Sequence, residues 1–326
     1  MLLSKEANMR HVFILNPVAG KNRTAMELRG KIDSYFSRHS ELEYSIRVTD
    51  GVGAATRIAQ EECAVGDSVR LYACGGDGTL QETAAGMPIG DKKVELAVIP
   101  CGSGNDYVRT FGEKGDFLQI ADMVEGTAEA VDAVDCGDRI SLNIASMGMD
   151  ASVGLKMQRY KNLPGVSGSM AYNIAVADVF FHPIGEEMTI EIDSIDGPVL
   201  RKGRYLMTLA ANGRYYGGGY CGAPKAVPDD GLLDFVLVKK IPRTQIPFVL
   251  GKYKKGEHDG IACLEHILGT GMRVRAAKSM VCNVDGECFD TESMTFSVIP
   301  HAFNIVMPKS LVVKKRSKRE VLSSGL

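Results

Sequence analysis

Two glycine-rich turns carry the residues whose types and spacing best suit chemistry. They read Gly75-Gly76-Asp77-Gly78-Thr79 and Gly102-Ser103-Gly104-Asn105-Asp106, and each follows an apolar run and precedes a stretch compatible with a helix. Such turns present backbone amides, hydroxyls and carboxylates, which together bind phosphate oxygens and the metal ion that accompanies them. The pattern therefore indicates a site for the phosphates of a nucleotide and for Mg²⁺.

A third turn, Asn16-Pro17-Val18-Ala19-Gly20, follows the apolar residues 12–15 in the same way. Asp77 is the most informative residue, because a carboxylate within Gly-Gly-x-Gly-Thr can reach Mg²⁺ or a phosphate-bound water. The alternative is a plain turn from strand to helix, capped by Asp77 or Thr79. Three such turns in the first third of the chain favour the phosphate site. Neither of the first two turns is a Walker A sequence, since no Gly-Lys-Ser/Thr follows.

The second glycine turn supports two interpretations. In the functional one, the Ser103 hydroxyl binds phosphate and Asn105 reaches the sugar or a metal-bound water. In the structural one, Asn105 and Asp106 cap the helix that follows. The two interpretations are compatible, and the residues alone do not separate them.

Two acidic segments stand out in the second half of the chain. Asp285 and Glu287 flank Gly286 after an apolar strand, so one of them could accept a proton from an attacking hydroxyl or help to hold metal. The local sequence favours a hairpin turn instead, since Asp-Gly is a strong hairpin signal. Residues 229–234 resemble an oxygen-rich metal loop, with the Asp230 carboxylate beside the carbonyls of Val227 and Leu232. A plain turn is the alternative there.

The first part of the chain, up to about residue 130, alternates strand and helix patterns, which predicts a doubly wound α/β domain with a parallel sheet covered on both faces. All three turns then fall beyond the carboxyl ends of the strands, where ligands bind in such sheets. The expected strands are 12–15, 44–49, 69–74 and 96–100, and the expected helices are 25–36 with Thr24 as N-cap, 54–63, 79–85 and 117–124.

From about residue 134 the pattern changes to strands of period two, which predicts an antiparallel, β-sandwich-like second domain. Residues 146–155, rich in Met and Ala, are expected in the core. The expected strands are 140–144, 188–192, 205–209, 232–238, 272–276 and 294–299, and the expected helices are 169–180 and 244–253.

Composition narrows the classes of function. The 326 residues carry a net charge of −2, which argues against nucleic acid as a partner. The eight cysteines form no C-x-x-C pair, which suggests reduced thiols and a cytoplasmic protein. We find no signal peptide and no apolar run of the ~20 residues needed to span a bilayer. The basic tail 314–319 is a solvated terminus or a site of attraction to anionic lipid.

Taken in order, these motifs resemble those of the bacterial diacylglycerol kinases and related lipid kinases, which share a catalytic domain with sphingosine kinases. The similarity to NAD kinases and phosphofructokinases, through Gly-Gly-Asp-Gly-Thr, is more distant. The resemblance covers nearly the whole chain, and its most specific elements are Asn16-Pro17 with Gly20, residues 75–81, 100–106 and 216–234, and Asp285-Gly286-Glu287.

The resemblance implies ATP and Mg²⁺ in a cleft between a nucleotide-binding domain, residues 1–133 with 302–326 returning to it, and a lipid-substrate domain, residues 134–301. It implies that Asp285 or Glu287 accepts the proton and that the Asp230 side chain holds a structural Mg²⁺ with main-chain oxygens of Val227 and Leu232. The implied nucleotide contacts are Asn16, Pro17, Val18, Ala19, Gly20, Thr49, Gly75, Gly76, Asp77, Gly78, Thr79, Leu80, Gln81 and Ser103. Asn105 and Asp106 of the second glycine turn complete the predicted nucleotide-binding set. Ser103 replaces the Thr of many relatives, and Gln81 replaces their commoner Asn or His.

The expected function is that of an ATP-dependent lipid kinase, which moves the γ-phosphoryl group of ATP onto a hydroxyl of diacylglycerol and yields phosphatidic acid. Asp77 would orient the metal or its waters. The expected location is the cytoplasm, with peripheral contact at the inner face of the membrane, and the resemblance suggests a homodimer. The alternatives are a kinase for another acceptor, such as a sphingoid base, a phospholipid head group or NAD, and a nucleotide-binding regulator without turnover.

Overall fold

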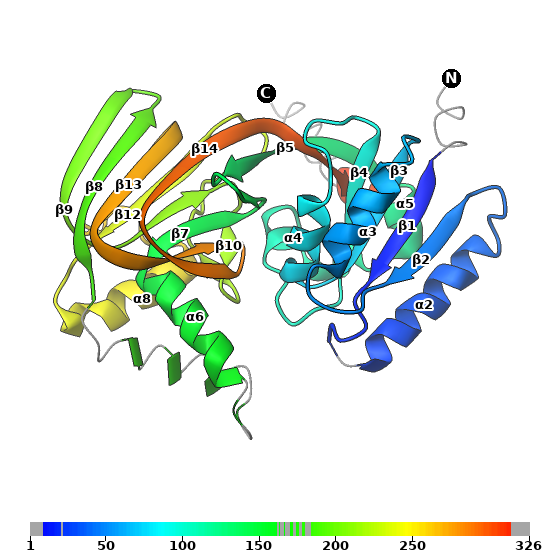
Figure 1. Cartoon of the computed structure of the whole chain (residues 1–326), viewed down its shortest axis with the longest axis horizontal. Helices are drawn as coiled ribbons and strands as arrows, with labels where there is room; N and C mark the ends of the chain where they lie inside the picture. The colour runs from blue at the N-terminus through cyan, green and yellow to red at the C-terminus, as the bar shows by residue number, and fades with distance from the viewer. Residues whose placement is uncertain are drawn as a thin grey trace, which may run out of the picture. The chain divides into compact units, whose positions relative to one another are not determined.

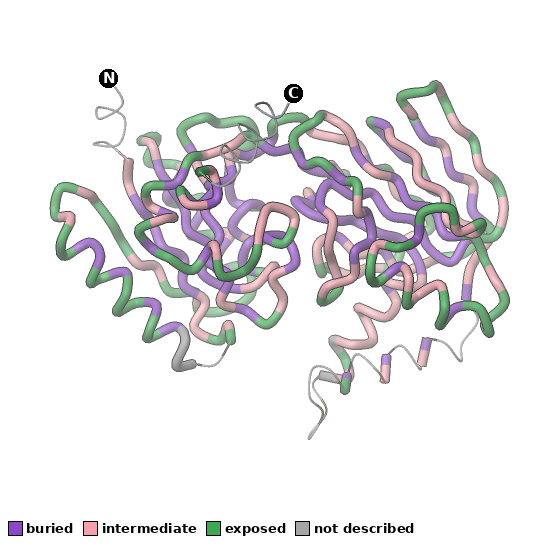
Figure 2. Tube along the Cα trace, turned by 180° about the vertical axis from the view of Figure 1, so that it is seen from behind, coloured by how far each residue is buried: buried purple, intermediate pink, exposed green. Residues whose placement is uncertain are grey.

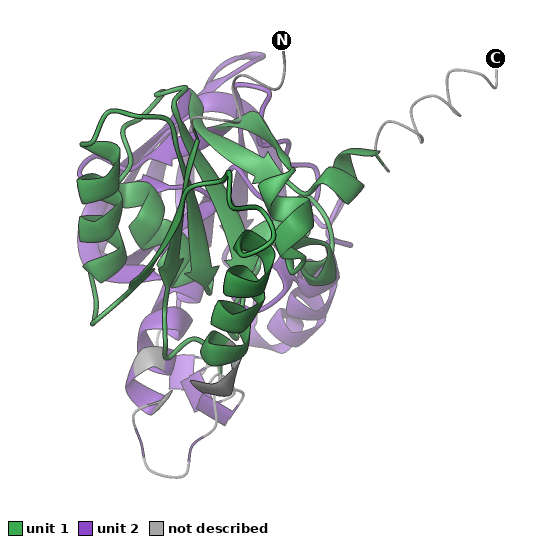
Figure 3. Cartoon of the chain, turned by 90° about the vertical axis from the view of Figure 1, so that its right-hand side faces the viewer, with its two compact units in different colours: residues 1–131, 301–326 green, residues 132–300 purple. Residues whose placement is uncertain are grey.

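The computed structural model describes residues 9–20, 22–161, 163, 166, 170–171, 174–175, 178–179 and 184–313, without the side chains of residues 22–24, 158 and 161. The chain forms two compact units, which Figure 3 distinguishes by colour. Unit 1 comprises Met1–Val131 with His301–Leu326, and unit 2 comprises Asp132–Pro300. The basic tail 314–319 lies outside the described residues.

A parallel sheet forms the centre of unit 1. Its strands lie in the order β4-β3-β1-β2, and every pair among them is parallel. All seven residues of β3 are buried, as expected of a strand that is covered on both faces of a parallel sheet. The end of β14 adds to this sheet in parallel beside β4. The bounds are β1 Arg10–Leu15, β2 Tyr44–Val48, β3 Val69–Gly75, β4 Val94–Pro100 and β14 Glu287–Met307.

The helices of unit 1 pack in pairs, α3 with α4 and α2 with α5, and Figure 3 shows helices on both sides of the sheet. This confirms the predicted α/β class. The bounds are α2 Asn22–Phe36, α3 Ala54–Cys63, α4 Asp77–Ala85 and α5 Ile120–Val124, with short 3₁₀ turns η1 Tyr107–Thr110 and η2 Lys114–Phe117. Helix α2 begins at Asn22, so Thr24, the predicted N-cap, lies within its first turn and that prediction is wrong.

The predicted helix 117–124 is wrong as a single element. A reciprocal capping box, in which Glu113 and Asp116 bond each other's backbone, starts a separate 3₁₀ turn at Lys114. Gln119 then adopts an extended backbone, and α5 begins only at Ile120. A local side-chain to backbone bond thus competes with the helical pattern.

Unit 2 consists mainly of antiparallel strands, which confirms the predicted sandwich-like class. Long strands pair in sequence-distant combinations, such as β13 with β8 and β12 with β9. The bounds are β5 Thr127–Asp135, β6 Ile140–Ser141, β7 Ile144–Gly148, β8 Glu186–Ser194, β9 Gly197–Ala211, β10 Tyr215–Tyr216, β11 Tyr220–Cys221, β12 Leu233–Lys239 and β13 Leu264–Val284, with η3 Arg243–Gln245 and the helices α6 Met149–Lys161 and α8 Ile246–Lys255.

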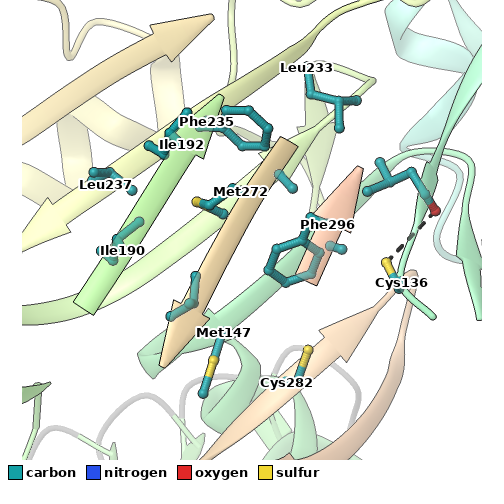
Figure 4. Packing of buried hydrophobic residues seen from close by; sticks show 14 of the residues in the cluster. Cys136, Met147, Ile190, Ile192, Leu233, Phe235, Leu237, Met272, Cys282 and Phe296 are labelled. Carbon is teal, nitrogen blue, oxygen red and sulfur yellow. Dashed lines mark hydrogen bonds between the residues drawn. The ribbon is translucent and has the colours of Figure 1, made fainter. Parts of the chain in front are cut away.

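Two apolar cores lie on opposite faces of these strands. On β12, Leu233, Phe235 and Leu237 enter one core, and Val236 and Val238 enter the other. This alternation is the two-residue period expected of a strand that is buried on both faces. Figure 4 shows the first core, and Figure 2 shows how buried residues concentrate in the strands of each unit.

Two predicted elements of unit 2 differ from the structure. The strand predicted at 140–144 is interrupted at Leu142 and Asn143, whose amides turn to the carboxylate of Asp285. The segment 146–155, predicted to lie in the core, is the end of β7 and the start of α6; residues 146–148 and 151 are buried and the others are half-buried. The helix predicted at 244–253 is η3 followed by α8, and much of the one predicted at 169–180 lies outside the described residues. Among the helices described, none combines the length and apolar character needed to cross a membrane.

Candidate functional site

The three predicted turns lie at the carboxyl ends of adjacent parallel strands of unit 1. Asn16 follows β1, Gly76 follows β3, and Cys101 follows β4, and the strand order makes these ends neighbours. Asn16 N donates to Cys74 O at 3.0 Å, and Thr49 N, just after β2, donates to Leu15 O at 3.0 Å. The sheet therefore brings Asn16, Thr49 and both glycine turns to one edge, as the sequence predicts for a parallel sheet.

The two glycine turns interlock through their backbones. The amides of Cys101 and Gly102 both donate to Gly75 O, each at 2.9 Å. A Cβ atom on Gly102 would lie 2.6 Å from Gly76 N, and one on Gly76 would lie 2.8 Å from Gly104 O. Glycine is therefore required here because one turn packs against the other, in addition to any approach of a ligand.

Hydrogen bonds of Asp77 connect the second glycine turn to the first. It is the first residue of α4, and its carboxylate accepts hydrogen bonds from Asp106 N at 2.9 Å and Tyr107 N at 3.3 Å. Its own amide donates to Gly104 O at 3.1 Å. Burial raises the pKa of this carboxyl, and the two amides act against that shift. Asp77 thus positions both turns, a role that the local sequence did not indicate.

Asn16 ties the third turn to the first. Its Nδ2 donates to the Thr79 hydroxyl at 2.9 Å, and its Oδ1 accepts from Val18 N at 3.1 Å. Thr79 is buried on α4, and its side chain fills the space that a Cβ on Gly75 would need. Both side chains are therefore engaged in holding the turns together.

The other residues of unit 1 that are predicted to contact the nucleotide differ in their exposure to solvent. Leu80 and Gln81 are buried in α4, and Asp106 is buried and lies 3.7 Å from Arg109 Nε. Residues 17 and 19 are half-buried, whereas the exposed positions are Val18, Gly20, Gly78 and Ser103.

Lys114 is a residue of this region that sequence reasoning missed. Its Nζ donates to Gly102 O at 3.2 Å, and Asn105 Nδ2 donates to the same oxygen at 2.6 Å. Lys114 is exposed, so its ammonium stands beside the second glycine turn as a cation open to solvent. No motif marks it in the sequence, because it comes from a separate 3₁₀ turn.

In unit 2, Asp285 organises the backbone around it. Asp285 and Gly286 form the two-residue turn between β13 and β14, with φ angles of 46° and 103°. The carboxylate accepts from the amides of Leu142 at 2.6 Å, Asn143 at 3.2 Å and Ile144 at 3.0 Å. Burial raises the pKa of Asp285 to about 6, although these three amides act in the opposite direction.

Glu287 has the opposite environment. Its side chain is 61% exposed, and Oε2 lies 3.4 Å from Arg139 Nε. The Arg139 guanidinium also stacks 4.4 Å from the centre of the Phe289 ring. The two acidic residues of the Asp-Gly-Glu segment therefore differ. Both carboxylate oxygens of Asp285 accept hydrogen bonds from backbone amides, whereas the carboxylate of Glu287 is exposed to solvent.

The loop around Asp230 gathers negative charge. Asp230 Oδ1 accepts from Leu232 N at 3.0 Å, and Asp132 Oδ2 accepts from Gly231 N at 2.7 Å. Burial and the charges of Asp132 and Asp229 raise the pKa of Asp230, and burial and Asp230 raise that of Asp234 to about 6. Asp132 was missed by the sequence analysis because it is about a hundred residues away in the chain.

Within the described ranges, no three His, Cys, Asp or Glu side chains come together as metal ligands. Val227, the third residue predicted here, is 40% exposed. The predicted set of one carboxylate with two carbonyls therefore remains a prediction.

Unit 2 also contains an apolar cavity of about 160 Å³. Its polar lining residues are Asp150, Tyr216, Tyr220, Tyr253 and Asn283, and the hydroxyls of Tyr216 and Tyr253 lie 3.1 Å apart. Burial raises the pKa of Asp150, and hydrogen bonds act against that shift. The apolar lining comes from α6, α8 and the neighbouring strands and includes Met149, Val153, Met157, Val179, Leu206, Met207, Val238, Ile241, Ile246, Val249 and Leu250.

Comparison with known proteins agrees with this division of the chain. Residues 10–136 match the diacylglycerol kinase catalytic domain family, and residues 143–307 match the YegS C-terminal NAD kinase beta sandwich-like domain. A probable lipid kinase YegS-like protein of Pseudomonas aeruginosa is 29% identical over 308 residues, which cover 94% of this chain and 98% of that protein. A protein of the same description from Shewanella frigidimarina is 26% identical, and the match covers 92% of this chain and 94% of that protein.

Solved structures show the same fold. The crystal structure of a diacylglycerol kinase from Bacillus anthracis superposes with a TM-score of 0.65 at 19% identity and covers 93% of this chain and 98% of that one. The crystal structure of yeast NADH kinase in complex with NADH superposes with a TM-score of 0.51 at 10% identity. The match covers 98% of this chain and 89% of that one. The chain belongs to the YegS-like lipid kinase family, whose members carry a diacylglycerol kinase catalytic domain and an NAD kinase-like β-sandwich domain.

Proposed function

We propose that this protein is an ATP-dependent kinase that transfers the γ-phosphoryl group of ATP to the hydroxyl of diacylglycerol and produces phosphatidic acid. The observation that carries the proposal is the interlock of the two glycine turns at the carboxyl ends of β3 and β4. Phosphoryl transfer depends mainly on positioning and on neutralising charge, and turns fixed in this way supply the positioning. The apolar cavity of unit 2 supports a lipid as the acceptor.

The nucleotide would bind to the exposed parts of the three turns. Gly78 and Ser103 are exposed, and open space surrounds a Cβ position on Gly78, so phosphate oxygens can approach the backbone there. Lys114 would add a positive charge beside the second turn. Asn16, Asp77 and Thr79 would act as positioning residues, since their side chains already hold the turns to one another.

Glu287 is the better supported proton acceptor of the Asp-Gly-Glu pair. A general base needs a carboxylate that can reach the acceptor hydroxyl, and Glu287 is exposed. Asp285 is occupied by three backbone amides and would instead hold the residues that connect β6 and β7. In the proposed step, a hydroxyl oxygen of the lipid forms the new bond to phosphorus, the bond to ADP breaks, and the hydroxyl proton passes to Glu287.

The residues of unit 2 fit one Mg²⁺, because Asp230 is exposed at the surface and gathers with Asp132 and Asp229, whose negative charge a cation would neutralise; burial and then these two charges raise the pKa of Asp230. Asp230 with the main-chain oxygens of Val227 and Leu232 would hold the ion, and water would complete its preferred oxygen shell. When bound, it would neutralise the charge of Asp230 and of the nearby Asp132 in β5 and Asp234 in β12. We also infer a cytoplasmic enzyme that meets its lipid at the membrane surface.

A lipid panel with γ-labelled ATP tests the proposal. The protein would be given diacylglycerol, a sphingoid base, a phospholipid and NAD, and label is expected in phosphatidic acid. Label in another product would replace diacylglycerol with that acceptor. If ADP release is the same with and without lipid and no product is labelled, the chain is a nucleotide-binding regulator. Glu287→Gln serves as the inactive control.

A further inference from the structure

Helix α8 has two contrasting faces. Ile246 and Tyr253 are buried, and with Val249 and Leu250 they form one wall of the apolar cavity. On the opposite face, Phe248 is 65% exposed, although phenylalanine is among the most costly side chains to leave in water. Figure 1 shows α8 outside the strands of unit 2, and its residues line the same cavity as residues of α6. The helix therefore separates an apolar cavity from an exposed aromatic ring.

The segment that contains α8 is strongly basic. Residues 239–255 hold six Lys or Arg and no acidic residue, in a chain whose net charge is −2. Lys252 Nζ lies 5.8 Å from the centre of the Phe248 ring, so the aromatic ring and the positive charge share one face. Within the part of the chain that the structure describes, no carboxylate pairs with Lys252, Lys254 or Lys255.

We propose that the outer face of α8, formed by Phe248, Lys252 and Lys255 with Lys254 at its edge, is a docking surface for an anionic lipid bilayer. Helices with an exposed aromatic residue and lysines on the polar side lie in the plane of a membrane interface, with the ring inserted and the ammonium groups at the lipid phosphates. The charge of this face complements anionic head groups.

The apolar cavity next to α8 explains what docking on a bilayer would achieve, namely access of lipid to the acceptor site. This part of the inference rests on the proposed function. Lys254 Nζ lies 5.3 Å from the ring of Tyr220, which lines the cavity. Lys254 itself does not line the cavity but lies next to a residue that does. A helix placed on a bilayer would bring the cavity to the level at which lipid chains are held. Docking would then supply lipid to the acceptor site of unit 2.

Sedimentation of the full-length protein with vesicles tests the docking surface without any need for turnover. The wild-type protein is expected to bind vesicles of phosphatidylcholine with phosphatidylglycerol and to bind pure phosphatidylcholine weakly. Since each lysine contributes about fivefold near an anionic surface, the Lys252→Gln, Lys254→Gln, Lys255→Gln triple variant should bind about 100-fold more weakly. Phe248→Ser should lose at least about tenfold.

Matched controls separate local from general charge. Lys31, Lys92 and Lys202 are exposed and lie on other elements, so the Lys31→Gln, Lys92→Gln, Lys202→Gln variant has the same net charge as the α8 triple variant. Val52→Ser is the control for Phe248→Ser, because Val52 is fully exposed in unit 1. Both controls should bind as the wild type does. Equal loss in test and control variants would overturn the proposal, as would loss only when Lys314, Lys315, Arg316 and Lys318 are neutralised.

An activity measurement distinguishes this inference from the proposed function. Phosphorylation of diacylglycerol in anionic vesicles should fall in the α8 variants, whereas phosphorylation of a dispersed short-chain diacylglycerol should not. If the wild-type protein binds vesicles through α8 but phosphorylates no lipid, the proposed function fails and the docking surface stands. If it phosphorylates diacylglycerol while the α8 variants bind vesicles normally, the docking surface is refuted.

Discussion

Asp285 and Glu287 are separated by one glycine, yet the structure gives them opposite tasks. We expect Glu287→Gln to lower kcat for lipid phosphorylation by about 10²–10⁴-fold, the usual contribution of a general base, with little change in KM for ATP. The free energy of unfolding should change by less than about 0.5 kcal/mol, because the pair that Glu287 forms with Arg139 is exposed. Steady-state kinetics and urea unfolding of the same preparation check both parts.

The matched variant Asp285→Ala should mainly lower the stability of the protein, unlike Glu287→Gln, which should mainly lower kcat. Asp285→Ala removes the acceptor of the amides of Leu142, Asn143 and Ile144, all three of which belong to buried residues. An unsatisfied buried amide costs about 1–3 kcal/mol, so the loss in unfolding free energy should exceed about 2 kcal/mol. A fully stable Asp285→Ala protein would contradict the role assigned to Asp285.

The pKa of Asp285 predicts a pH dependence of stability. Burial raises it from 3.8 to about 6, so between these values the folded protein binds the proton that the unfolded chain has already released. The contribution of Asp285 to the free energy of unfolding should therefore fall as pH rises from about 4 to 6 and stay constant above. The difference between wild type and Asp285→Asn, measured by urea unfolding across this range, should show that slope. Parallel curves would refute the assignment.

At the scale of elements, the packing of the two glycine turns decides whether unit 1 can hold a nucleotide. A Cβ on Gly102 would press on the backbone of Gly76, whereas a Cβ on Gly115 in η2 meets nothing within 4 Å. We expect Gly102→Ala to raise the Kd for ATP at least about tenfold by separating the turns, and Gly115→Ala to leave it unchanged. Calorimetric titration of both variants checks this, and normal ATP affinity in Gly102→Ala would remove the basis of the proposed site.

Elements formed by local pattern were predictable from the sequence, and contacts between distant residues were not. Helix α3 occupies the predicted range 54–63, because its apolar period and flanking glycines lie within one short segment. In contrast, the bonds from Asp77 to Asp106, from Asp132 to Gly231 and from Asp285 to Leu142 join residues 29, 99 and 143 positions apart. The sequence identified Asp77 and Asp285 as unusual, but their partners depend on the fold.

The same limit explains the missed helix α6. Its first residues, Met149 to Leu155, mix apolar and small polar side chains, and the helix follows directly on β7 with no connecting residues to mark the change of period. Apolar runs without clear periodicity do not distinguish strand from helix. The wall of the cavity that α6 provides was therefore beyond sequence reasoning, although the apolar character of its residues was evident.

At the scale of the whole molecule, each unit has its own core and its own candidate ligand. The glycine turns belong to unit 1, and the apolar cavity belongs to unit 2. Under the proposed function, a non-hydrolysable ATP analogue should slow amide hydrogen exchange in residues 75–79 and 102–106, and a diacylglycerol should slow it in α6 and α8. Ligand binding stabilises the structure that holds the ligand, so at about 100 times Kd the gain in local opening free energy should reach about 2.7 kcal/mol. If the ATP analogue slowed hydrogen exchange in α6 and α8 and not in the glycine turns, the nucleotide would bind to unit 2. That result would contradict the proposal that unit 1 binds the nucleotide and unit 2 binds the lipid.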